Sequence, residues 1–198
     1  MPATASGRVG ASRWRRPPIS SYEPLREAAR RFCPPYEVLE ESKARLRIKL
    51  RDPQGRRPDV TLRHRNERRL FLKANYLHIS STVPGKGPSV DGQITFRFRG
   101  WLSRQRANPT WTSEGSGSDE WLDRLREPLG RAVADIQAVQ SLRIAWSARR
   151  GAWRIELKTM SGSMVSGITA MVPIAVPFDR EEAAGFIAII DALAAVPS

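Results

Sequence analysis

The stretch that decides the fold runs from Lys43 to Arg51 and reads K-A-R-L-R-I-K-L-R. Its even positions are apolar, and its odd positions are all cationic: Lys43, Arg45, Arg47, Lys49 and Arg51. Because successive side chains of a β-strand point to opposite faces, this alternation predicts a strand with one apolar face and one wholly cationic face. A helix would spread both sets around its circumference, which favours the strand interpretation.

A second stretch, residues 93–101, repeats this alternation, with Arg97, Arg99 and Trp101 on the polar side. If both stretches join one sheet, their outer faces form a broad cationic plate. Like charges directly opposite one another destabilise a sheet by up to about 1 kcal/mol per pair, so a bound anion would explain such a plate. The alternative is that long arginine and lysine stems cover the sheet and solvate its outer surface. The predicted anion-binding residues are Lys43, Arg45, Arg47, Lys49, Arg51, Arg63, Arg97, Arg99 and Trp101.

Further runs of alternating or apolar residues predict strands at residues 36–41, 60–65, 70–75, 76–82, 141–148, 152–159, 164–170 and 172–178. Helical spacing of apolar residues predicts three helices, at residues 22–32, from Ser118 or Asp119 to Gln137, and after Asp179. Ser118 or Asp119 is expected to cap the second helix, and Asp179 with Glu182 three residues on predicts a capping box at the start of the third. Strands that follow one another without intervening helices favour antiparallel pairing. The predicted fold class is therefore α+β, an antiparallel sheet or sheets with helices packed on the apolar face. The repeated order of helix and strands is compatible with two structurally similar halves.

Segments rich in turn-forming residues are expected to connect these elements: a tight connection at residues 65–68, a flexible loop at 83–92, a polar linker at 103–118 and a turn at 161–163. Within the loop, Gly85-Lys86-Gly87 lacks both the spacing and the following helix of a phosphate-binding loop. Pro128 predicts a kink in the second helix, or a break at which a new helix opens.

The positive charge is concentrated in the first part of the chain. The net charge is +13; residues 1–110 hold 24 Lys/Arg against 9 Asp/Glu, whereas residues 111–198 hold 9 against 11. Residues 1–21 contain four arginines and no acidic residue, which predicts a disordered basic arm, although an organellar transit peptide has a similar composition. We therefore divide the chain into this arm, a basic subdomain at 22–110 and a near-neutral subdomain at 111–198.

Cysteine usage and hydropathy predict a cytoplasmic protein. Cys33 is the single cysteine, so no disulfide can form within the chain, and a reducing compartment is indicated. No run approaches the roughly 20 apolar residues of a membrane span, and the first residues lack the apolar core of a secretory signal. The C-terminal helix has a wide apolar surface, so we expect it either to be buried on two sides or to mediate self-association.

No group of residues has the spacing of a known catalytic or metal site. His64 and His78 have no partner at metal-ligand spacing, and one cysteine cannot complete a zinc site. The acidic residues form no recognisable catalytic dyad. We therefore expect structural histidines, no metal, no cofactor and no enzymatic activity, with a catalytic site assembled from distant residues as the alternative.

These observations predict a non-enzymatic binding module whose basic sheet face and N-terminal arm engage an anionic partner. Nucleic acid is favoured, because arginine outnumbers lysine and aromatic residues lie among the cations. The aromatic residues concerned are Trp14, Phe98, Trp101 and Trp111. The alternatives are docking on an acidic protein surface, as an assembly protein would, and peripheral binding to an anionic membrane.

Overall fold

The structure is a computed structural model that describes residues 22–32, 36–42, 45–50, 58–69, 72–97, 110–136, 138–167 and 174–195. These residues form helices and antiparallel strands, which confirms the predicted α+β class. The helices are α1 (Tyr22–Arg31), α2 (Ser118–Ala134) and α3 (Arg180–Ala194). The strands are β1 (Tyr36–Ser42), β2 (Arg45–Leu50), β3 (Asp59–Arg69), β4 (Leu72–Pro84), β5 (Gly92–Arg97), β6 (Thr110–Glu114), β7 (Val139–Ser147), β8 (Ala152–Gly167) and β9 (Ile174–Ala175).

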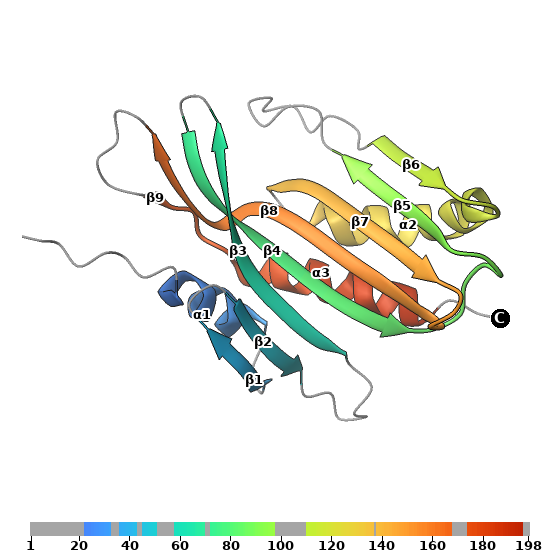
Figure 1. The fold of residues 1–198 in the computed structure, drawn as a ribbon, viewed down its shortest axis with the longest axis horizontal. Helices are drawn as coiled ribbons and strands as arrows, with labels where there is room; N and C mark the ends of the chain where they lie inside the picture. The colour runs from blue at the N-terminus through green and yellow to red at the C-terminus, as the bar shows by residue number, and fades with distance from the viewer. Residues whose placement is uncertain are drawn as a thin grey trace, which may run out of the picture.

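The described strands belong to one sheet of nine strands, in the order β1-β2-β3-β4-β8-β7-β5-β6, with β9 paired to β8 (Figure 1). β4 pairs with β8, and β5 pairs with β7, so strands from both sides of residue 110 are interleaved. The division drawn at residue 110 therefore does not coincide with a break in the sheet. It falls at β6, whose partner β5 lies before it in the chain.

The helices cover one face of this sheet. α1 packs on β2 and β3, α2 packs on β5 and β6, and α3 packs on β4 and along α2. Figure 1 shows α2 and α3 behind the strands. Phe32, after α1, stacks on Phe178 and meets Phe186 of α3 edge-on, with ring centroids 5.8 and 6.1 Å apart. One hydrophobic core thus lies between the helices and the sheet, and no described helix covers the opposite face.

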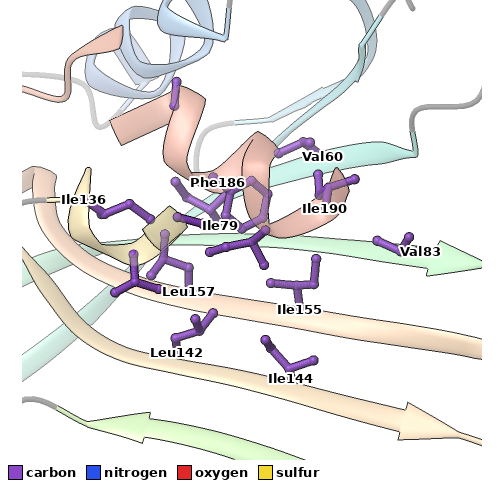
Figure 2. Packing of buried hydrophobic residues seen from close by; sticks show 14 of the residues in the cluster. Val60, Ile79, Val83, Ile136, Leu142, Ile144, Ile155, Leu157, Phe186 and Ile190 are labelled. Atoms are coloured by element: carbon purple, nitrogen blue, oxygen red, sulfur yellow. The ribbon is translucent and has the colours of Figure 1, made fainter. Parts of the chain in front are cut away.

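The middle of the core is formed by β4, β7 and β8 against α3 (Figure 2). Ile79 comes from β4, and Leu157 from β8 lies beside it; both are fully or almost fully buried. Phe186 and Ile190 of α3 pack onto them. The strand alternation predicted at residues 152–159 is what directs Leu157 to the helical side.

The start and the burial of α3 agree with the sequence analysis. Asp179 Oδ1 accepts a hydrogen bond from the Glu182 backbone N–H at 2.9 Å, and Glu182 Oε2 accepts one from the Asp179 backbone N–H at 3.2 Å. This is the predicted capping box. Because α3 contacts both α2 and the sheet, it is buried on two sides, which was the first of the two expectations for its wide apolar surface.

The connection predicted at residues 65–68 is wrong, because β3 continues through Arg69. Asn66 and Glu67 pair with Asn75 and Ala74 of β4, so the polar run is the flank of a long hairpin and not its turn. The two strands predicted on either side of residue 76 are one strand, β4, with a register shift opposite β8. Continuous ladder hydrogen bonding has outweighed the local turn preference of these polar residues.

The turn predicted at residues 161–163 is also wrong, because these residues lie inside β8. Gly162 has a φ of 71°, a left-handed conformation that favours glycine, and β8 bulges there against β4. Ser163 Oγ accepts from the Leu77 backbone N–H at 2.9 Å and donates to the Thr159 carbonyl at 2.8 Å, which supplies hydrogen bonds that the ladder loses at the bulge. The strand predicted at residues 164–170 is therefore the end of β8 as far as Gly167, and the described part of the one predicted at 172–178 contains only β9.

The segment predicted as a polar linker contains a strand, β6, which pairs with β5. Trp111 of β6 lies opposite Phe96, with ring centroids 4.6 Å apart, so this aromatic residue packs on the helix-covered side. α2 begins after Gly117, which has a φ of 75°, and not with the predicted side-chain cap. It continues as one helix through Pro128, so the predicted break does not occur.

The loop at residues 83–92 was predicted to be flexible, but it is anchored at its centre. The indole Nε1 of Trp153 donates to the Lys86 carbonyl at 2.9 Å, and that of Trp146 donates to the Pro88 carbonyl at 2.7 Å. Gly87 lies directly against the Trp146 ring, where a Cβ would overlap the indole. Glycine here allows the backbone to approach an aromatic ring closely.

Candidate anion-binding face

The cationic side chains lie on the face of the sheet opposite the helices, which we call the open face. In β2, Leu46 and Ile48 are buried on the helical side, whereas Arg47 and its neighbours on the same parity point away from it. Residues that pair across antiparallel strands lie on the same face, so the registers show which residues of the other strands share the open face with Arg47. The charged residues of the open face are Glu37, Glu40, Arg45, Arg47, Lys49, Asp59, Arg63, Arg65, Glu67, Arg97, Glu114, Arg143, Arg154, Glu156 and Lys158.

One line of positions on this face crosses the sheet perpendicular to the strands, and we call it the cationic row because four of its six members are cations. The register pairs its members strand by strand in the order Arg45, Arg63, His78, Lys158, Ser141 and Arg97. Five strand spacings of about 4.8 Å make the row roughly 24 Å long. β2 and β5 therefore contribute to the same face of one sheet, although four strands separate them.

The chain's own carboxylates balance part of this charge. Arg45 lies 3.4 Å from Glu40, and Arg47 lies 3.7 Å from Asp59. On β8, Arg154 pairs with Glu156 at 2.6 Å. These pairs are exposed, and exposed ion pairs contribute at most about 1 kcal/mol, so a bound polyanion could displace them at little cost.

Other cations of the open face have no carboxylate partner among the described residues. Arg63, Arg65, Arg97 and Lys49 make no ion pair within this part of the chain, and all four are exposed. Arg143 donates from Nε to the side-chain oxygen of Gln93 at 2.8 Å, so its charge is not balanced by that contact. The arginines without a carboxylate partner among the described residues of this face therefore lie on β3, β5 and β7 and not on β2, where the sequence alternation is most regular.

The predicted site residues divide into two groups. Arg45, Arg47, Lys49, Arg63 and Arg97 lie on the open face. The remaining ones, Lys43, Arg51, Arg99 and Trp101, lie outside the described residues, as do Trp14, Phe98 and the basic arm.

Sequence analysis did not single out Arg65, His78, Arg143, Arg154 and Lys158 as members of this face. Alternation within residues 152–159 did place Arg154 and Lys158 on the polar side of a strand. Only the pairing of β8 with β4 brings Lys158 next to β3 and its arginines, and no local sequence signal specifies that pairing.

His78 lies at the centre of the cationic row, between Arg63 of β3 and Lys158 of β8. Lys158 contacts the carboxylate of Glu67 at 2.5 Å, and its Nζ lies 4.1 Å from the centroid of the Tyr76 ring. His78 Nε2 is shielded from solvent and has no hydrogen-bond partner in the described part of the chain. Burial, and then the positive charges of Arg65 and Lys158, lower the pKa of His78 from 6.5 to about 4, while Glu67 and Glu156 act in the opposite direction.

A shallow depression lies beside the row, where β7 and β8 carry Ala145 among longer side chains. Arg143, Arg154 and Glu156 surround it. Ala145 pairs with Arg154 across the two strands, and Arg143 pairs with Glu156. Arg143 and Arg154 are therefore diagonal neighbours, and the small side chain of Ala145 lies between them.

The second histidine of the chain, His64, has a structural role. His64 is buried, with Nε2 at 2.8 Å from the Gly162 carbonyl, so it supports the β8 bulge. Among the described residues, no three His, Cys, Asp or Glu side chains are grouped so as to hold a metal ion. Within the same ranges, no helix is both long and apolar enough to cross a membrane.

Residues 32–196 match the model of a family described as "Protein of unknown function (DUF3156)". The chain belongs to the DUF3156 family. The matched region contains every strand of the sheet and therefore the whole open face, whereas the basic arm at residues 1–21 precedes it. No curated protein and no solved structure matches this DUF3156 chain.

Proposed function

We propose that this DUF3156 protein is a non-enzymatic nucleic-acid-binding protein that contacts phosphates through its open face, assisted by the basic arm. The observation that carries the proposal is the cationic row, which places four positive side chains along roughly 24 Å of a face that no described helix covers. Arg63, Arg65 and Arg97 on this face lack carboxylate partners within the described ranges. Arginine suits this role because its planar group of donors matches phosphate oxygens.

The composition of the face favours contacts to the nucleic-acid backbone over contacts to bases. Among the described residues, the aromatic side chain on this face is Tyr76, which is buried beneath Lys158, and Trp111 packs on the opposite side against Phe96. Single-strand binders stack bases on exposed aromatic rings. Without such rings, phosphate contacts give affinity that depends on charge and salt and very little on base sequence.

Nucleic acid fits this face better than a membrane surface does. Proteins that bind membranes peripherally combine cations with apolar or aromatic side chains that insert into the headgroup region. The large apolar side chains exposed in the described part of the chain are Val38, Leu39, Val90 and Ile174. They lie on the edge strand β1, in the 83–92 loop and on β9, so none belongs to the cationic row. We place this binding in the cytoplasm, as the single cysteine predicts.

The test is a salt titration of binding, followed by fluorescence anisotropy with a labelled 20-base-pair DNA duplex, a single-stranded RNA of the same length, and anionic vesicles. The variant is Arg63→Gln/Arg65→Gln/Arg97→Gln. Its control is Arg124→Gln/Arg126→Gln/Arg131→Gln, which removes the same charge from the exposed side of α2, where each arginine has an acidic partner.

We expect the open-face variant to reduce the slope of log affinity against log salt concentration by about 2.7 for duplex DNA, since each lost phosphate contact contributes about 0.9. The α2 control should leave the slope within error of the native protein. Equal effects of the two variants would contradict a site on the open face. Tight binding to vesicles or to an acidic protein, with no binding to either nucleic acid, would overturn the proposed ligand in favour of that partner.

A further inference from the structure

The centre of the open face, where β3, β4 and β8 adjoin, concentrates positive charge around one histidine. Arg63 lies directly across from His78 on β3, and Lys158 lies directly across from it on β8. Arg65 is two residues along β3 on the same face. The acidic groups nearby are Glu67 on β3, which contacts Lys158, and Glu156 on β8, which pairs with Arg154.

We propose that His78, Arg63, Arg65 and Lys158 form a binding site for one phosphate group of a nucleic acid, and that filling this site is coupled to the uptake of a proton by His78. This inference rests on the proposed function, since the phosphate is part of the bound polymer. It adds a defined centre to the face and a dependence of affinity on pH.

The chemistry of the site fits a phosphate diester. Arg63 and Arg65 are exposed and have no carboxylate partner in the described ranges, so their guanidinium groups can turn towards an anion placed over His78. Lys158 is held against Glu67 and the Tyr76 ring, so it supplies positive charge from a fixed position at the floor of the site. His78 Nε2 is shielded but has no hydrogen-bond partner among the described residues, so turning the ring to bring this atom towards a phosphate would break no hydrogen bond of Nε2. A protonated imidazole would then donate from it to a phosphate oxygen.

Proton uptake follows from the same geometry. In the free protein, burial and the adjacent cations keep the imidazole neutral. A phosphate diester brings a negative charge next to the ring, which favours the protonated form and offsets the repulsion from Arg65 and Lys158. By linkage, if the phosphate strengthens proton binding, the proton strengthens phosphate binding by the same factor. Affinity should therefore rise as the pH falls.

The test uses the full chain and the labelled duplex, with anisotropy measured from pH 8.0 to pH 5.5 at constant ionic strength. The range ends at pH 5.5, more than one unit above the pKa of about 4 that aspartate and glutamate have in model peptides. The native protein is compared with His78→Gln and, as a control on the same strand and face, Ser80→Ala. Arg65→Gln is a second variant, which removes one of the cations that keep the imidazole neutral.

For the native protein and for S80A, we expect the affinity to rise as the pH falls, by up to about tenfold per pH unit. This rise should occur between the pKa of His78 in the complex and its lower pKa in the free protein. For H78Q the affinity should be nearly constant between pH 8.0 and pH 5.5, because glutamine takes up no proton in this range. For R65Q, NMR of the free protein should show the His78 ring titrating at higher pH, which is readable because the chain has only two histidines. Calorimetry in two buffers of different ionisation enthalpy should show proton uptake for the native protein and none for H78Q.

The two levels of the proposal fail in different ways. If duplex binding persists but H78Q keeps the native pH dependence, the proton-coupled site is overturned and binding by the open face stands. If circular dichroism shows that H78Q is less folded, the NMR titration of the His78 ring in R65Q becomes the deciding measurement. A His78 titration in R65Q equal to that in the native protein would then overturn the site. If the native protein binds no nucleic acid at low salt at any pH in the range, the proposed function and the site that rests on it fall together.

Discussion

At the scale of single residues, the cations of the open face differ in how far their charge is already balanced. Arg45 and Arg47 have carboxylates within 4 Å, whereas Arg63, Arg65 and Arg97 have none in the described part of the chain. Paired arginines must exchange one partner for another when an anion binds, but unpaired ones only gain a partner. The unpaired arginines should therefore account for most of the affinity, although β2 has the more regular sequence pattern.

His78 predicts a pH dependence of stability that needs no ligand. Its pKa in the folded protein, about 4, lies below the value of 6.5 in the unfolded chain. Below pH 6.5 the unfolded chain therefore binds more protons, so this residue's contribution to stability is fully present above pH 6.5 and is lost as the pH falls towards 4. In urea denaturation, the free energy of unfolding should fall more between pH 7.5 and pH 5.0 for the native protein than for His78→Gln. Equal falls would mean that the imidazole is not disfavoured as a cation.

At the scale of secondary-structure elements, close contact between α2 and α3 depends on one glycine. A Cβ on Gly185 of α3 would lie 2.7 Å from the Ala132 carbonyl and 2.8 Å from Ile136. Gly130 of α2 has open space around its Cα, with no atom within 4 Å of an added Cβ. The two helical glycines therefore offer a matched pair of substitutions in which only packing differs.

Gly185→Ala should lower the free energy of unfolding by about 1–3 kcal/mol, because overpacking outweighs the gain in helix propensity. Gly130→Ala should raise it by up to about 1 kcal/mol, because only the propensity changes. Chemical denaturation followed by circular dichroism measures both values. A stabilising effect of Gly185→Ala would show that the two helices are not in close contact.

The elements that could be predicted from the sequence are those whose signal is local. Alternation at residues 43–51 predicted β2 and its outward arginines, and Asp179 with Glu182 predicted the start of α3. The connection predicted at residues 65–68 was wrong because β3 continues through them, paired with β4. The turn predicted at residues 161–163 was wrong because Gly162 and its serine neighbour are accommodated by a bulge that forms only against β4. Local residue preference cannot distinguish a turn from a bulge when the partner strand lies far away in the chain.

The candidate site was predictable only in part for the same reason. For each strand, the alternation of residues identified the cations on its polar face, such as Arg63 in β3 and Arg97 in β5. The position of His78 between Arg63 and Lys158 depends on two registers, β3 with β4 and β4 with β8. The second of these joins segments about 80 residues apart, and the sequence carries no signal for it.

At the scale of the whole molecule, the basic arm and the open face contribute to one charge distribution. Residues 1–21 contain four arginines and no acidic residue, and they precede α1, which packs on β2 and β3 of the same sheet. If the arm adds phosphate contacts, its arginines should increase the salt dependence of binding without changing the stability of the sheet.

Replacing the four arginines of the arm by serine should reduce the slope of log affinity against log salt by up to about 3.6, at about 0.9 for each phosphate contact. The thermal midpoint should stay unchanged, and these two measurements together separate a binding role from a folding role. A slope equal to that of the native protein would show that the open face acts without the arm.

The interleaving of the sheet has a consequence for synthesis on the ribosome. In the sheet, β4 lies between β3 and β8. β4 ends at Pro84 and β8 begins at Ala152, so about seventy residues must be added to the chain before β4 and β8 can pair. At a synthesis rate of roughly 5–20 residues per second, the β4 edge of the β3–β4 hairpin stays unpaired for roughly 3–14 seconds. Bare strand edges invite pairing between chains, and neighbouring nascent chains that carry a large excess of arginine repel one another. The same charge that equips the finished surface for an anionic ligand would thus protect the unfinished sheet from aggregation.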